Sequence, residues 1–162
     1  MELWDAYDSA FCKIPNKQLV RGEPVPDGMF HLVCDVIVRH TDGAYLLMQR
    51  DPRKPWGGMW EATVGGSALA GETPLDCALR ELREETGIIA DRLAEVGRMA
   101  VPEHRSIYVE FLCEIGWDKT AVTLQEGETV AFRWVGREEL LRMDRDELVT
   151  KRMQQFMEDL KK

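Results

Sequence analysis

The segment between residues 66 and 88 constrains the fold most, because it encodes a helix with both ends marked. Thr73 suits the N-cap, Pro74 suits the first helical position, and Gly87 suits the residue after the last turn. Apolar residues at helical spacing predict that one face of this helix packs on a core. That stripe consists of Leu75, Leu79, Leu82 and Thr86.

Apolar and β-branched runs surround the helix and predict strands. The expected strands cover residues 29–39, 44–50, 60–64, 93–101, 106–115 and 130–135. The expected helices after the central one cover residues 137–142 and 146–160. Residues 1–29 are expected to form short strands and turns. The strand 60–64 is expected to end in a glycine-rich loop at Gly65 and Gly66. Strands on both sides of a central helix favour the α/β class, with a mixed sheet covered on both faces.

Length and charge limit the functions that the chain can have. Its 162 residues predict one domain, 1–162, that is large enough to bury a core without staples. The formal charge of −8 disfavours binding to a nucleic-acid polymer, because an acidic surface repels phosphate backbones. An anionic substrate would therefore need local cations. No apolar run approaches the roughly 20 residues that cross a bilayer, so no membrane partner is expected.

Cysteine usage points to a reducing compartment. The four cysteines form no C-x-x-C pair and no zinc-type spacing with histidine. Cys34 and Cys113 lie in apolar runs and are interpreted as buried, whereas Cys77 lies inside the expected helix. The N-terminus has neither the basic start nor the apolar stretch of a signal peptide. A cytoplasmic location is the simplest expectation.

Three glutamates on the central helix are the main candidates for chemistry. Glu81, Glu84 and Glu85 stand at i, i+3 and i+4, so they share a face about 100° wide beside the apolar stripe. Like charges at this spacing repel, and a hard divalent cation with oxygen ligands would relieve the repulsion. Arg80 can pair with Glu84 one turn later. An acidic helix flank is, however, most often plain solvated surface.

The spacing of the whole segment favours a functional role for these acids over plain solvated surface. It follows the pattern G-x5-E-x7-R-E-U-x-E-E-x-G-U, where U is a bulky aliphatic residue. The specified positions are filled by Gly66, Glu72, Arg80, Glu81, Leu82, Glu84, Glu85, Gly87 and Ile88. This segment, residues 66–88, resembles the Nudix box, the signature of the Nudix hydrolases. The resemblance implies an α/β/α sandwich and hydrolysis of a nucleoside diphosphate linked to another group X.

The resemblance also implies roles for individual residues. Gly66, through its carbonyl, and Glu81, Glu84 and Glu85 would bind Mg²⁺ or Mn²⁺. Water would attack phosphorus in line, and a carboxylate would take its proton. Glu81 and Glu84 are candidates for that base, with Arg80 fixing the rotamer of a neighbouring acid. Glu128 is a further candidate, because relatives can use an acid six residues before a strand Trp, here Trp134.

The loop before the box supplies candidates for substrate binding. Arg50, Arg53 and Lys54 could hold the phosphates as charge-assisted donors, although single basic loop residues are often plain surface. Trp56 is the candidate for stacking on a base. Trp60 and Tyr108 are alternatives for stacking, and Trp60 is interpreted as core.

Two other functions stay open. The N-terminal part resembles the branch of the family similar to isopentenyl-diphosphate isomerase, and His31 matches a histidine of that branch. Gly65 and Ser67, however, stand where the isomerase has its catalytic Cys and a metal-binding His. The second alternative is a non-catalytic binding module, and such modules usually lose acids of the box. The group X stays undetermined between ADP-ribose, a dinucleotide, an oxidised nucleotide and an isoprenoid diphosphate. The N-terminal strands could also pair in a homodimer.

Overall fold

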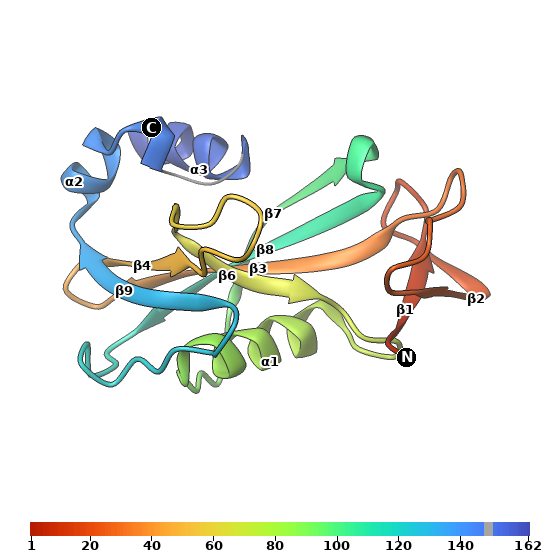
Figure 1. Ribbon diagram of the computed structural model, residues 1–162, viewed down its shortest axis with the longest axis horizontal. Coiled ribbons are helices and arrows are strands. Elements are labelled where there is room, and N and C mark those ends of the chain that lie inside the picture. Colours follow the sequence, from red (N-terminus) through yellow and green to blue (C-terminus); the bar gives the residue numbers. More distant parts are fainter. Residues whose placement is uncertain (148–150) are drawn as a thin grey trace.

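A long strand, β3 (His31–His40), runs through the middle of the computed structural model, which describes residues 1–147 and 151–162 (Figure 1). The other strands of its sheet are β4 (Tyr45–Arg50), β5 (Trp60–Glu61), β6 (Thr63–Ser67), β7 (Ala94–Val101), β8 (Ser106–Ile115) and β9 (Thr129–Val135). β3 pairs in parallel with β8 along its whole length and antiparallel with β6 and β4. β4 also pairs with β5 and β9, and β7 pairs with β8. The sheet is therefore mixed, as expected.

Helices cover both faces of this sheet, which confirms the expected α/β/α sandwich (Figure 1). α1 (Pro74–Thr86) packs on one face. On the other face lie α2 (Arg137–Arg142) and α3 (Lys151–Lys161), and Leu140 and Phe156 pack there against Ile37 and Leu47. The expected helix 146–160 begins later than predicted, because residues 145–147 form a 3-10 turn. Its residues 148–150 lie outside the described part of the chain.

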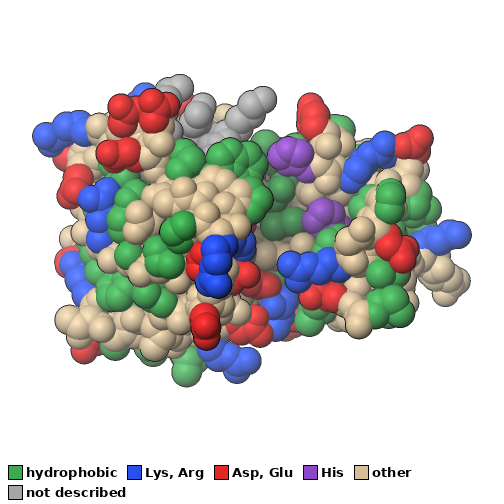
Figure 2. All heavy atoms as spheres, viewed as in Figure 1, with side chains coloured by type: hydrophobic (Ala, Val, Ile, Leu, Met, Phe, Trp, Pro, Cys, Tyr) green, Lys and Arg blue, Asp and Glu red, His purple; other side chains and the backbone are tan. Residues whose placement is uncertain are grey.

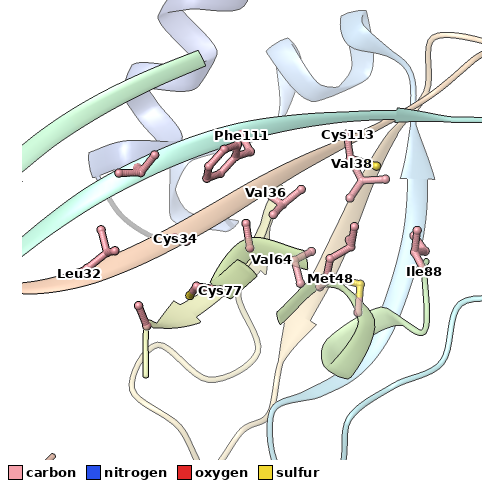
Figure 3. Close-up of a cluster of buried hydrophobic side chains, with 14 of the residues drawn as sticks. Leu32, Cys34, Val36, Val38, Met48, Val64, Cys77, Ile88, Phe111 and Cys113 are labelled. Atoms are coloured by element: carbon pink, nitrogen blue, oxygen red, sulfur yellow. The ribbon is translucent and has the colours of Figure 1, made fainter. Parts of the chain in front are cut away.

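The main core fills the space between the sheet and α1 (Figure 3). Side chains of β3, β6 and β8 point into it together with α1, and Leu82 is fully buried there. Truncation of such a side chain costs about 2–5 kcal/mol, so this layer holds the helix firmly against the sheet. Cys34, Cys77 and Cys113 are buried in this layer as small hydrophobic residues, as predicted for Cys34 and Cys113.

Both ends of α1 are formed by the predicted residues. Thr73 accepts from Asp76 N at 3.1 Å, Asp76 bonds back to Thr73 N, and Pro74 begins the helix. Gly87 ends it with φ +76°, a left-handed conformation that favours glycine. The predicted apolar stripe is partly wrong, since Leu75 is exposed. The small residues Cys77 and Ala78 face the sheet beside Leu82 instead, so the backbone of α1 can approach closely.

The segment after Met59 also differs from the prediction. Two short strands, β5 and β6, replace the single expected strand 60–64, because β5 pairs with β4 whereas β6 pairs with β3. Gly65 and Gly66 lie inside β6 and not in a loop. A β-carbon on Gly65 would lie 2.0 Å from the carbonyl oxygen of Cys34, so the close approach of the two strands requires glycine.

The N-terminal residues form a separate two-stranded sheet, as expected for short strands and turns. β1 (Leu3–Tyr7) and β2 (Lys13–Val20) are antiparallel. Two backbone hydrogen bonds of 2.9 Å between Tyr7 and Phe30 join β1 to the start of β3. In the described ranges, no helix has the length and apolar character needed to cross a membrane.

Candidate active site

The carboxylates of α1 are organised by one arginine. Arg80 Nε and Nη2 donate to the two carboxylate oxygens of Glu72 at 2.7 and 2.9 Å, a bidentate pair. Arg80 Nη1 donates to Glu81 at 2.6 Å and to Glu84 at 3.2 Å, so the predicted i,i+4 pair is present. The hydrogen bond to Glu72, followed by the bond to Glu81, raises the pKa of the guanidinium further, although burial acts in the opposite direction. Arg80 therefore ties the loop before α1 to the acids on the helix.

Gly66 and Glu81 approach each other across the gap between β6 and α1. A β-carbon at position 66 would lie 2.6 Å from Glu81 Oε1 and 2.9 Å from Oε2. The bare backbone of Gly66 is therefore the wall against which the Glu81 carboxylate lies. The carbonyl of Gly66 accepts from the thiol of Cys77 at 3.5 Å, so it too faces α1.

Glu85 stands one turn after Glu81, in surroundings that disfavour a negative charge. Its pKa is raised well above the usual value, first by burial and then by repulsion from Glu81, Glu61 and Asp35. The ammonium of Lys54 offsets only part of this effect. A cation beside this carboxylate would favour its ionised form.

Glu61 and Asp35 complete this acidic cluster and were missed in the sequence. Glu61 lies in β5 and forms a 2.8 Å ion pair with Arg50. Asp35 is buried in β3, directly opposite Gly65. The one signal for Asp35 was an acid inside the apolar run 32–38, and Glu61 gave no signal because its strand spans two residues. Neither position follows from helical spacing, since three separate elements bring the acids together.

The donor set of this site fits a hard divalent cation. Carboxylate oxygens and a backbone carbonyl are the ligands that Mg²⁺ and Mn²⁺ favour, and a cation among these acids would offset the repulsion of Glu85 by Glu81, Glu61 and Asp35. Among the residues that the structure describes, no three His, Cys, Asp or Glu side chains are already closed into a metal-binding group. Glu81 is turned toward Arg80 instead, so cation binding requires that it change partner.

Of the basic residues before the box, Arg53 and Lys54 lie on the loop between β4 and β5, and Arg50 is the last residue of β4. Arg50 and Lys54 are the two that adjoin the cluster, Arg50 through Glu61 and Lys54 through its attraction to Glu85. Arg53 is turned away: it is largely exposed and bonds Asp51 at 2.6 Å, which contributes to lowering the pKa of Asp51 to about 2. In Figure 2, basic and acidic side chains meet in the middle of this face, beside a hollow.

The aromatic candidates have different environments. Trp56 is 59% exposed and has a left-handed backbone, φ +55°, which is uncommon for a residue with a side chain. Trp60 is half-buried against the smaller core, with the guanidinium of Arg133 4.7 Å above its ring, and Tyr108 is buried. Only Trp56 thus presents an open ring of the kind that can stack on a ligand.

Glu128 is held by the same loop. Its carboxylate contacts Lys54 Nζ, and its carbonyl accepts from Asp51 N at 3.0 Å. The structure thus brings Glu128 to the border of the site through Lys54. His31, in contrast, stacks on Trp4 with ring centroids 4.4 Å apart, and its Nδ1 lies 3.1 Å from the Arg105 carbonyl. His31 is therefore a packed residue of β3.

Comparisons with known proteins agree with this geometry. The NUDIX domain family matches residues 29–160. A Nudix hydrolase of Listeria monocytogenes is 30% identical over 141 residues, which cover 86% of this chain and 83% of the relative. An isopentenyl-diphosphate Delta-isomerase of Corynebacterium diphtheriae is 31% identical over 84 residues, 51% of this chain and 46% of the isomerase.

Solved structures share the fold at lower identity. The crystal structure of DR0079 from Deinococcus radiodurans superposes with a TM-score of 0.78 at 19% identity, and covers 99% of this chain and 100% of that one. The NUDIX domain of Shewanella oneidensis NrtR, solved with ADP ribose, has a TM-score of 0.65 at 18% identity and covers 82% and 86%. Since the family match spans most of the residues, this chain belongs to the Nudix family.

Proposed function

We propose that the protein is a Mg²⁺- or Mn²⁺-dependent hydrolase that cleaves the phosphoanhydride bond of a nucleoside diphosphate linked to another group. One observation carries the proposal. Burial raises the pKa of Glu85, and repulsion from neighbouring acids raises it further. These neighbours come from three elements: Glu81 from α1, Glu61 from β5 and Asp35 from β3. Acids are gathered in this way at sites that bind cations or perform acid–base chemistry.

Gly66, Glu81 and Glu85 are proposed to hold the cation, with Glu84 on the exposed side of the helix. The chemistry that a divalent cation supplies at such a site is neutralisation of diphosphate charge and acidification of water. Arg80 donates to both Glu81 and Glu84, and its guanidinium is itself fixed by two bonds to Glu72. Glu81 would turn from Arg80 to the cation, whereas Glu84 would keep its bond to Arg80.

Substrate binding is assigned to Arg50 at the end of β4 and to the loop between β4 and β5. Lys54 and Arg50 adjoin the acids, so their charges lie where a diphosphate would approach the cation. Arg53 is exposed and would contact only a group that extends away from the site. The exposed ring of Trp56 is suited to stacking on a base.

Glu128 is the proposed general base, with Glu81 and Glu84 as the alternatives on the helix. Its carboxylate is held by Lys54 at the border of the acidic cluster. When Lys54 turns to a phosphate, Glu128 loses its ion-pair partner and can accept a proton from water. Glu81 and Glu84 are less suitable because both already accept hydrogen bonds from Arg80.

ADP-ribose is the first compound to test, because the NrtR domain was solved with it. The experiment is a panel of nucleoside diphosphate compounds incubated with the protein and Mg²⁺, Mn²⁺ or EDTA. The proposal predicts release of phosphate-containing products that requires the metal. Tight binding of a diphosphate without turnover would favour a binding module instead. Isomerisation of isopentenyl diphosphate without hydrolysis would favour the isomerase branch, in which Gly65 and Ser67 would be anomalous.

A further inference from the structure

The N-terminal sheet precedes the residues that match the Nudix family, yet it bonds the loop that leads into α1. The carbonyl of Leu3 accepts from Ala70 N at 2.8 Å. The carboxylate of Asp5 accepts from Gly71 N, also at 2.8 Å. β1 therefore holds two successive amides of the loop between β6 and α1.

Asp5 is well suited to this task because its surroundings keep it charged and fixed. Its side chain is buried, and the same oxygen that receives the Gly71 amide lies 2.7 Å from Lys13 Nζ. Burial raises the pKa of Asp5, but the hydrogen bonds from Lys13 and Gly71 outweigh it and lower the pKa overall. Gly71 itself has φ +89°, a conformation that Asp5 helps to hold in place.

The residue after Gly71 is the one that fixes Arg80. Glu72 accepts from Leu69 N at 2.8 Å and from two nitrogens of Arg80 at 2.7 and 2.9 Å. A shift of the Gly71 peptide would move the Glu72 backbone and break this bidentate geometry, which depends on planar alignment. The position of the Arg80 guanidinium therefore depends on β1, through Gly71 and Glu72.

Arg80 has a second set of partners that compete with a cation. Its Nη1 donates to Glu81 at 2.6 Å and to Glu84 at 3.2 Å. An arginine released by Glu72 would turn its remaining donors to these helix acids. Glu81 already accepts from Nη1, and further donors from Arg80 would make it less available as a ligand.

We propose that Asp5 is a positioning residue of the active site: through Gly71 and Glu72 it holds Arg80 in place and keeps Glu81 available for a divalent cation. The inference rests on the proposed metal-dependent function and deepens it. It makes the N-terminal sheet part of the catalytic apparatus, although no residue of that sheet touches the acidic cluster through the contacts described.

The test is Mn²⁺ binding to the full chain without substrate, followed by electron paramagnetic resonance of the free ion. Asp5→Ala is expected to raise the dissociation constant for Mn²⁺ about tenfold, as outer residues of metal sites typically do. Hydrogen exchange should show that the Gly71 amide loses protection while β3 and β8 keep theirs. In assays with a turned-over diphosphate, the Mg²⁺ concentration for half-maximal rate should rise by the same factor.

Two variants separate positioning from general stability. Lys13→Met removes the exposed partner of Asp5 but leaves the Gly71 bond, so Mn²⁺ affinity should change less than about twofold. Asp5→Asn retains an acceptor oxygen for Gly71 and should restore most of the affinity. If Asp5→Ala does not fold, Asp5→Ser replaces it, because a hydroxyl one bond shorter should not reach the Gly71 amide. Wild-type Mn²⁺ affinity in Asp5→Ala, with or without Gly71 protection, would overturn the inference. Failure of the wild-type protein to bind Mn²⁺ would overturn the proposed function instead.

Discussion

Gly66 on β6 and Glu81 on α1 are in such close contact that a methyl group at position 66 would occupy the space of the Glu81 carboxylate, 2.6 Å from Oε1. Gly65, one residue earlier, is restricted by a different kind of neighbour, the backbone carbonyl of Cys34 at 2.0 Å. A carboxylate at the end of a flexible side chain can move, whereas a backbone carbonyl in a central strand cannot. A side chain therefore restricts position 66, whereas the backbone of the neighbouring strand restricts position 65.

Substitution of these two glycines should separate function from folding. Gly66→Ala is expected to fold with a Tm within a few degrees of wild type but to lose at least tenfold in turnover, because Glu81 is displaced. Gly65→Ala should lower the free energy of unfolding by at least about 1–3 kcal/mol, because β6 and β3 must move apart. Urea unfolding and diphosphate hydrolysis measure the two effects.

Gly136→Ala is the control, since its β-carbon meets nothing within 4 Å. Full activity in Gly66→Ala would contradict the account.

Glu85→Gln should stabilise the metal-free protein at neutral pH while abolishing turnover. The folded-state pKa of Glu85 lies above the unfolded value near 4.5. Its favourable contribution is therefore present below pH 4.5 and is lost as the pH rises through the folded pKa. Glutamine removes that loss of stability, and a gain of about 1 kcal/mol raises Tm by about 2–4 °C in a chain of this size. Thermal unfolding in EDTA from pH 4 to 8 is the measurement.

The matched control for this change is Glu138→Gln, on the exposed face of α2, which should leave Tm and its pH dependence as in wild type. Mg²⁺ should raise the Tm of the wild-type protein and not that of Glu85→Gln. A Glu85→Gln protein less stable than wild type in EDTA at pH 8 would contradict the raised pKa.

Glu128→Gln tests the proposed general base. Loss of a base typically lowers kcat by about 10²–10⁴-fold, with little change in KM. If Glu128 only restrained Lys54, its removal would instead free Lys54 for the phosphates and lower KM. The control is Glu126→Gln, an exposed acid of the same loop, for which wild-type kinetics are expected. Steady-state kinetics with a diphosphate substrate distinguish these outcomes, and a kcat within threefold of wild type would remove Glu128 from the mechanism.

His31 should make stability depend on pH in the direction opposite to Glu85. Burial lowers the pKa of this ring below 6.5, the value for the unfolded chain. The unfolded chain then binds more protons, so the free energy of unfolding falls as the pH drops from about 6.5 toward the folded pKa. His31→Gln should flatten this slope between pH 5 and 7 in urea titrations, whereas the exposed His104→Gln should leave it. An unchanged slope in His31→Gln would show that the ring is not the cause.

The predictable parts of the fold were those encoded by neighbouring residues. Thr73, Pro74 and Gly87 mark the ends of α1 by capping chemistry that acts within one turn, so both ends of α1 agree with the prediction. β8 and α2 also have the predicted bounds, since composition changes sharply at their ends. By contrast, the division of residues 60–67 into β5 and β6 depends on which strand each half pairs with, and that is a long-range choice.

The site was predictable to the same extent. Helical spacing gave Glu81, Glu84 and Glu85, but it could not show that Glu61 and Asp35 join them, because β5 and β3 reach the site only through tertiary packing. The exposure of Leu75 has a similar cause. Cys77 and Ala78 determine which face of α1 is turned toward the sheet, because their small side chains let the helix backbone pack closely on it. The larger Leu75 does not determine this orientation.

The most direct test of the central claim is the anomalous scattering of a crystal grown with Mn²⁺. The account predicts a peak bounded by the carbonyl of Gly66 and the carboxylates of Glu81 and Glu85, with Arg80 still bonded to Glu72 and Glu81 turned from Arg80 to the ion. Those carboxylates remaining apart, with Glu81 on Arg80 and no peak between them at saturating Mn²⁺, would contradict it.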